Sequence, residues 1–204
     1  VHSGGMDSTV LLYQLVARGD EVKALSIDYG QRHAREIESA RALTASLGVE
    51  HRVADLRSLA ELLGGSALTS SELEVPEGHY EEENMKATVV PNRNMILLSL
   101  AIGHAVNIGA NVCFYGAHGG DHVLYPDCRP EFVERMNDVA AIADFTPVRI
   151  AAPYLHASKE EILADGLAMG LDYAQTWTCY LGAERSCGHC GSCRERLAAF
   201  AAQG

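Results

Sequence analysis

The chain has 204 residues and a formal net charge of −11 at pH 7; 48% of its residues are apolar and 21% are charged. These values match a globular domain long enough to bury a substantial core, and the acidic balance argues against a nucleic-acid scaffold, because such proteins bind phosphates through Lys and Arg. No apolar run approaches the roughly 20 residues of a membrane span, and no charged-then-apolar leader follows Val1, so we expect a cytoplasmic protein without a membrane partner.

Amphipathic helices alternate with apolar strands along the chain. In chain order we expect a helix at 9–18, a strand at 21–28, a helix at 34–47, a strand at 49–54, a helix at 94–107, a strand at 111–116, a helix at 130–143, a strand at 148–152, and helices at 158–169 and 194–202. This alternation predicts an α/β, Rossmann-like fold: a doubly wound parallel sheet with helices on both faces. We expect one domain at 1–204, with a cysteine-bearing appendage at 177–204, and a further strand upstream of Val1.

The segment 64–92 interrupts this alternation, because it is rich in Gly, Ser, Glu and Pro. A stretch of this length without regular structure is more often a functional lid than an ordinary connection. A disordered surface loop is the alternative interpretation.

A Ser-Gly-Gly-Met-Asp-Ser turn at Ser3–Ser8 leads directly into the first predicted helix. Adjacent glycines let the backbone approach an anion closely, and the free amides at the start of a helix favour negative charge. The turn lacks the Gly-Lys-Ser/Thr ending of a Walker loop. On spacing alone, an ordinary turn with a Ser or Asp N-cap is an equal alternative.

Four of the six cysteines lie within fifteen residues, at Cys179, Cys187, Cys190 and Cys193. Four thiolates satisfy tetrahedral Zn²⁺ and leave no open position, so the predicted role of this metal is structural. An iron–sulfur cluster or redox disulfides are the alternatives. We expect His189 to point outward and Cys113, in an apolar strand, to be a core residue.

Three predicted strands are each followed by a cluster of polar residues. These clusters occupy 28–33, 116–129 and 152–159, and a further cluster occupies 90–94. Because ligands gather beyond the carboxyl ends of the strands in a doubly wound sheet, these clusters predict a site at one sheet edge. Taken singly, Asp28 and Asp127 could be caps or turn formers, Ser158 with Glu161 reads as a capping box, and His118 and His122 read as solvent-facing loop residues.

The motifs SGGMDST, DYGQRH, VPNRN, YPDCRPEF and TCY, followed by CGHCGSC, resemble in their order the 7-cyano-7-deazaguanine (preQ0) synthase family of the PP-loop ATP pyrophosphatase superfamily. The resemblance implies an ATP-dependent ligase that joins 7-carboxy-7-deazaguanine and ammonia to give preQ0 for queuosine-type nucleosides, acts as a homodimer and binds no nucleic acid directly. The segment 117–124 departs from the usual family pattern, which leaves the contacts to the base open.

Carried over residue by residue, the resemblance implies four groups of functional residues. ATP would be bound by His2, Ser3, Gly4, Gly5, Met6, Asp7, Ser8 and Thr9; catalysis would use Asp7, Arg93, Asp121 and Lys159; the substrate would contact Tyr29, Gln31, Arg32, Arg93, Tyr125, Asp127 and Arg129; and zinc would be held by Cys179, Cys187, Cys190 and Cys193.

Within this resemblance we expect Asp7 to assist Mg²⁺ and Asp121 or Asp127 to bind the guanine-like edge of the substrate. Another adenylating enzyme of the superfamily, transferring sulfur to tRNA or passing the activated base to a different amine, is the main alternative. A zinc-stabilised protein that binds ATP without turnover is a second alternative.

Overall fold

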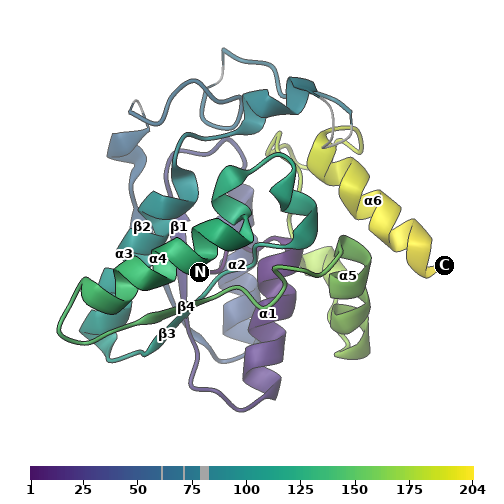
Figure 1. Ribbon diagram of the computed structural model, residues 1–204. Coiled ribbons are helices and arrows are strands. Elements are labelled where there is room, and N and C mark those ends of the chain that lie inside the picture. The colour runs from purple at the N-terminus through teal and green to yellow at the C-terminus, as the bar shows by residue number, and fades with distance from the viewer. Residues whose placement is uncertain (61, 71, 79–82) are drawn as a thin grey trace.

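The computed structural model describes residues 1–60, 62–70, 72–78 and 83–204 and confirms the predicted order of helices and strands (Figure 1). The elements are α1 (Met6–Ala17), β1 (Lys23–Asp28), α2 (Arg35–Ser46), β2 (Glu50–Asp55), α3 (Arg93–Ile108), β3 (Val112–Phe114), α4 (Pro130–Ile142), β4 (Arg149–Ala151), α5 (Lys159–Ala168) and α6 (Gly191–Gln203). Helices α1 and α6 each begin three residues earlier than expected, so α1 includes half of the glycine turn.

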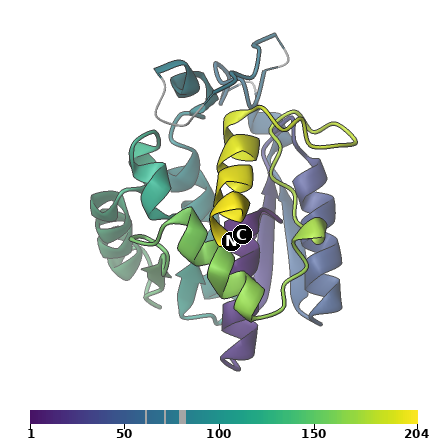
Figure 2. The same cartoon turned by 90° about the vertical axis from the view of Figure 1, so that its right-hand side faces the viewer.

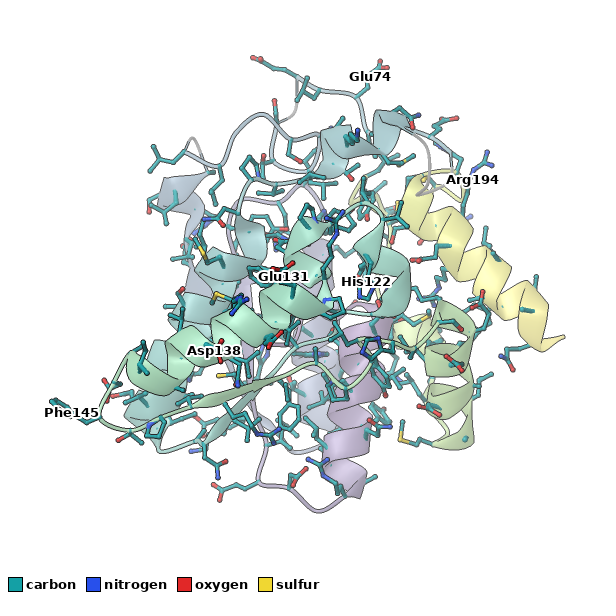
Figure 3. All side chains as sticks on the ribbon, viewed as in Figure 1. Glu74, His122, Glu131, Asp138, Phe145 and Arg194 are labelled. Atoms are coloured by element: carbon teal, nitrogen blue, oxygen red, sulfur yellow. The ribbon has the colours of Figure 1, made fainter. Side chains whose placement is uncertain are left out.

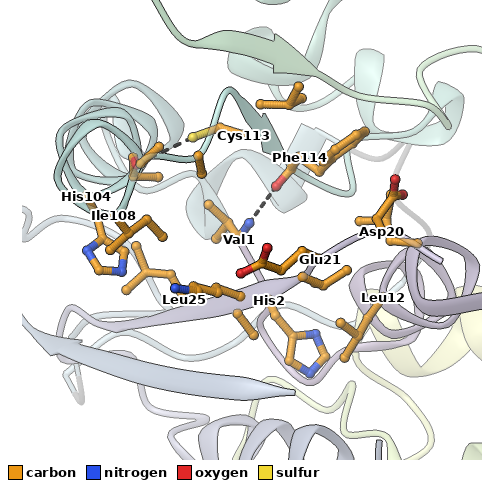
Figure 4. A pocket seen from close by; sticks show the side chains of 18 of the residues that line it. Val1, His2, Leu12, Asp20, Glu21, Leu25, His104, Ile108, Cys113 and Phe114 are labelled. Carbon is orange, nitrogen blue, oxygen red and sulfur yellow. Dashed lines mark hydrogen bonds between the residues drawn. The ribbon is translucent and has the colours of Figure 1, made fainter. Parts of the chain in front are cut away.

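The strands pair in parallel as two ribbons, β1 with β2 and β3 with β4. Residues Val1 and His2 lie between the ribbons: the amide of His2 donates to Leu25 of β1, and the nitrogen of Val1 donates to Phe114 of β3. Next to this bridge, β1 and β3 line a cavity of about 560 Å³ (Figure 4). The expected upstream strand concerns residues outside this sequence and stays a prediction.

Helices cover both faces of the strands, as predicted, and each face has its own hydrophobic core. On one face, α3 and α4 pack over β1, β3 and β4 through residues such as Leu98, Met136 and Ile150. On the other face, α1, α2, α5 and α6 meet around Leu43, Ile162 and Ala199, and Figure 2 shows α5 and α6 beside α1. No helix in the described part of the chain is both long and apolar enough to cross a membrane.

The long segment between β2 and α3 crosses above the carboxyl ends of the strands (Figure 1). It contains a 3₁₀-helix, Glu83–Thr88, where no regular structure was expected, and Leu68 and Met85 are fully buried. Arg32 holds this segment by donating to the carbonyls of Ala67, Ser70 and Leu73. Residues 71 and 79–82 of the predicted lid lie outside the described residues, and its closure stays a prediction.

Candidate active site

The glycine turn presents backbone N–H groups that have no helical acceptor at the start of α1. In this described segment no side chain caps the helix at Gly5, and the amides of Met6, Asp7 and Ser8 occupy the first turn, where an α-helix offers no acceptor. Gly4 has a φ of +85°, and a Cβ there would lie 2.1 Å from the carbonyl oxygen of Glu36. Only glycine therefore allows the turn to pack against α2 with its amides free to bind an anion.

The turn opens into a cavity of about 240 Å³ whose walls come from both halves of the chain. We call one part of it the charged end, formed by Asp7, His118, Asp121 and Lys159. We call the other part the tyrosine end, formed by Tyr29, His33, Glu36, Arg93 and Tyr180. Both lie at the carboxyl ends of the strands, the edge where the polar clusters of the sequence were expected to converge.

At the charged end, Lys159 is buried among acidic side chains. Its Nζ lies 2.8 and 2.7 Å from the carboxylate oxygens of Asp7 and 3.2 Å from that of Glu195. Lys159 begins α5, where the predicted capping box of Ser158 and Glu161 is present. Glu195 reaches the same point from α6, because α5 and α6 pack side by side (Figure 2).

The protonation states at the charged end follow from burial and pairing. Burial alone would lower the pKa of Lys159, but the carboxylates of Asp7 and Glu195 raise it above its ordinary value. Burial opposes ionisation of Asp7, yet the charge of Lys159 and its hydrogen bonds leave the pKa of Asp7 below the usual range. Burial raises the pKa of Glu195, against the attraction of Lys159. The ammonium of Lys159 and the carboxylate of Asp7 are therefore both charged at neutral pH.

The expectation that His118 faces solvent is wrong. Its side chain is 2% exposed, its Nε2 lies 3.2 Å from Lys159 Nζ, and its Nδ1 accepts from the amide of Gly120. His118 is the N-cap of the short 3₁₀-helix Gly119–His122, and the hydrogen bond from Gly120 holds its ring at the charged end. His122, by contrast, is half-buried.

The tyrosine end combines aromatic rings with one arginine and one carboxylate. Arg93 begins α3 directly after Asn92, whose left-handed φ of +58° redirects the chain, and its guanidinium lies 5.6 Å from the ring centroid of Tyr125. The rings of His33 and Tyr180 are 5.7 Å apart. Tyr180 follows Cys179, so the cysteine appendage contributes to this wall of the cavity.

The predicted site residues fall into three groups. All members of the turn except Gly4 and Thr9 line the cavity, as do Tyr29, Arg93, Asp121 and Lys159. A second group supports the walls from behind: Gln31 bonds to the backbone of Tyr29 and Ile27, Tyr125 to Thr88, and Asp127 to the amide of Asn94. Arg32 holds the long segment, and Arg129 is exposed and donates to the carbonyl of His122.

Two acidic residues were missed by sequence reasoning, Glu36 at the tyrosine end and Glu195 at the charged end. Each lies on the inner face of an amphipathic helix that also carries exposed charged residues, such as Glu38 on α2 and Arg194 on α6. For Glu36, a position three residues after His33 at the end of the DYGQRH motif was the available signal. For Glu195, the sequence offered none, because its partner Lys159 is 36 residues away.

The four cysteines converge as predicted. Their sulfur atoms lie within 4.8 Å of one another, and Cys187 Sγ is 3.9 Å from Cys193 Sγ. Tetrahedral zinc with Zn–S bonds of about 2.3 Å separates its sulfurs by about 3.8 Å, so the donor set fits this metal. His189 is exposed and pairs with Glu77 at 2.9 Å, outside the cluster, and Cys113 is buried in the core; both predictions are confirmed.

Comparisons with known proteins show which family the chain resembles along its whole length. A family model described as queuosine biosynthesis protein QueC matches residues 1–204. The 7-cyano-7-deazaguanine synthase of Chromohalobacter salexigens is 77% identical over 204 residues, covering 100% of this chain and 81% of that protein. The enzyme of the same name from Alteromonas mediterranea is 61% identical over 200 residues, covering 98% and 91%.

A solved structure, the U34-tRNA thiolase NcsA from Methanococcus maripaludis with its 4Fe–4S cluster, aligns with a TM-score of 0.53. The alignment covers 91% of this chain and 58% of that one, at 13% sequence identity. This likeness concerns the fold alone.

Proposed function

The chain belongs to the family of the queuosine biosynthesis protein QueC, and we infer from this membership that it is an enzyme that makes 7-cyano-7-deazaguanine. The named relatives match nearly the whole chain at 77% and 61% identity. The reaction we propose is the ATP-dependent ligation of 7-carboxy-7-deazaguanine with ammonia, so that its substrates are small molecules.

The chemistry requires a leaving group that a carboxylate lacks. In our proposal the substrate carboxylate attacks the α-phosphorus of ATP, and pyrophosphate leaves. Ammonia then displaces AMP to give an amide. The amide oxygen attacks a second ATP, pyrophosphate leaves again, and loss of AMP and of both N–H protons leaves the nitrile. Both rounds need fixed donors where negative charge grows on pyrophosphate.

One observation carries this proposal: the uncapped amides of α1 and the ammonium of Lys159 face one cavity. We propose that the turn, from His2 to Thr9, binds the phosphates of ATP, and that Lys159 moves from Asp7 to neutralise their charge. Arg93 would hold the substrate carboxylate or its adenylate. Arg32 and Arg129, which the structure places away from the cavity lining, would act indirectly.

Two metals complete the proposal. Mg²⁺ would balance phosphate charge when bound with ATP, and Asp7, released by Lys159, has the carboxylate oxygens that this ion prefers. Zinc would be held by the four cysteines and would keep α6 and Tyr180 in place against the cavity. Metal analysis of purified protein distinguishes zinc from an iron–sulfur cluster.

The decisive experiment incubates the protein with ATP, Mg²⁺, ammonium and 7-carboxy-7-deazaguanine and follows both pyrophosphate and the mass of the product. A nitrile formed with release of AMP and pyrophosphate is the expected result. Parallel reactions replace the deazapurine by tRNA with a sulfur donor, and ammonium by a peptide amine. Turnover only in one of these parallel reactions would replace the proposed function by that alternative.

The remaining expectations stay proposals. We propose a single domain over 1–204 with its zinc-binding appendage at 177–204, a cytoplasmic location, and a homodimer. The apolar residues Val139, Ile142 and Phe145 are exposed at the end of α4, and Phe145 projects away from the rest of the molecule (Figure 3). Light scattering of purified protein tests the dimer.

A further inference from the structure

Glu36 is a carboxylate in the cavity wall whose neighbours do not balance its charge. Its side chain is 14% exposed. One oxygen accepts from the amide of Gln31 at 3.1 Å, and the other lies 3.5 Å from Nε2 of His33. Burial lowers the pKa of His33 to about 3, so at neutral pH both of these neighbours are uncharged.

The charge of Glu36 is therefore incompletely stabilised in the ligand-free protein. Burial raises its pKa to about 8, although the hydrogen bond from Gln31 and the charge of Arg93 act in the opposite direction. A carboxylate has about four acceptor positions, and the two neutral neighbours occupy only two of them. The group is consequently suited to accept hydrogen bonds from a ligand that enters the cavity.

The other carboxylates near this cavity are already engaged. Asp127 accepts from the first-turn amide of Asn94 on α3, and Asp7 pairs with Lys159. Asp121 faces His118 at 3.6 Å. The sequence-based expectation that Asp121 or Asp127 binds the guanine-like edge therefore gives way to a carboxylate at the opposite end of the cavity.

The substrate in the proposed function carries two adjacent N–H donors, at ring N1 and at the 2-amino group. We propose that Glu36 binds this edge through both carboxylate oxygens and so selects a 2-amino-6-oxo ring. The inference rests on the proposed function and adds a specificity-determining residue to it. Gln31 acts as a positioning residue, since its amide also bonds to Ile27 and its carbonyl to Tyr29.

One cavity is lined both by Glu36 and by the phosphate-binding turn. The rings of Tyr29, His33 and Tyr180 line the same end and offer aromatic faces against which a planar base can pack. A base held by its amidine edge at Glu36 can thus direct its 7-carboxyl group toward the charged end.

The test compares kcat/KM for 7-carboxy-7-deazaguanine with that for the same compound lacking the 2-amino group, using pyrophosphate release by the full chain. We expect the wild-type protein to prefer the first compound by about 10- to 100-fold, the discrimination typical of a bidentate pair. Glu36→Gln should reduce this preference to within about 3-fold, chiefly through KM, because its amide nitrogen cannot accept. Glu36→Asp should retain an intermediate preference.

Glu38→Gln is the matched control, because Glu38 lies on the same helix with an exposed side chain and should leave the preference unchanged. A full preference in Glu36→Gln would overturn the inference and leave the proposed function intact. If that variant does not fold, an undiminished preference in Glu36→Asp would overturn it equally. A wild-type protein that releases no pyrophosphate with either compound would remove the proposed function and this inference together.

Discussion

The two ends of the cavity differ in whether a buried carboxyl group is paired with a cation. At the charged end, Lys159 lies between Asp7 and Glu195, and a carboxylate oxygen of each lies within 3.2 Å of its Nζ. At the tyrosine end, the two side chains next to the Glu36 carboxyl group, Gln31 and His33, are neutral, and burial raises its pKa to about 8 against the charge of Arg93. The comparison indicates that Lys159 and Asp7 are paired before ligands arrive, whereas in our proposal Glu36 gains its hydrogen-bond donors from a ligand. The cysteine appendage supports both, through Glu195 on α6 and through Tyr180.

The largest effect is expected from breaking the cysteine cluster, because this disturbs both ends at once. Cys193→Ser, or chelation of the bound metal, should lower turnover by about 10³-fold or more and the melting temperature by about 10 °C or more, since binding of a structural metal is coupled to folding. Pyrophosphate release and thermal melting measure the two effects. Cys113→Ala, outside the cluster, serves as control; wild-type activity in metal-free protein would contradict the prediction.

Asp7→Asn should act on the charged end alone. It removes a carboxylate that pairs with Lys159 while keeping the shape of the side chain, so we expect turnover to fall by about 10³-fold with little change in melting temperature. The exposed pair of Arg18 and Asp20 supplies the control, Asp20→Asn. Undiminished nitrile formation would remove Asp7 from the mechanism.

Glu195→Gln should have a smaller effect, because Lys159 keeps its bonds to Asp7. We expect kcat to fall by about 10-fold, with the KM for the deazapurine nearly unchanged, since electrostatic positioning of one charge contributes about 1–2 kcal/mol. Steady-state kinetics with Glu134→Gln, an exposed position on α4, as control will test this. A rise in the deazapurine KM alone would contradict the separation of the two ends.

The smallest expected effect is a pH dependence of stability at the tyrosine end. The pKa of Glu36 is raised from 4.5 to about 8 in the folded protein, so between these values the folded state binds more protons than the unfolded state, and stability falls as pH rises. Asp28 adds to the raised pKa, whereas Arg93 and Gln31 oppose it. Relative to wild type, Glu36→Gln should gain about 1–3 kcal/mol of unfolding free energy between pH 5 and 9.

Urea unfolding of both proteins at pH 5, 7 and 9 measures this difference. Because the two proteins share all other titrating groups, their difference isolates Glu36. Parallel stability curves would mean that Glu36 is as well stabilised as Asp7, and the contrast between the two ends would disappear.

Local patterns in the sequence were sufficient for the fold and for the parts of the site that are contiguous in the chain. The alternation of helical and strand-like hydrophobic patterns predicts the helices and strands. The N–H groups of the phosphate-binding turn all belong to the short segment Ser3–Ser8, and the four cysteines lie within fifteen residues. Each of these features depends on short-range backbone geometry or on ligand spacing, and residues close together in the chain determine both.

Only the tertiary structure decided which side chains face one another. Lys159 meets Asp7 across 152 residues and Glu195 across 36 because α1, α5 and α6 pack together. In the sequence His118 and Glu36 look like surface residues, but in the fold their side chains are 2% and 14% exposed. A charged group can be paired with another residue, exposed to solvent, or buried and able to bind a ligand. Which of these holds depends on burial and on residues distant in the chain, and a single sequence does not specify either.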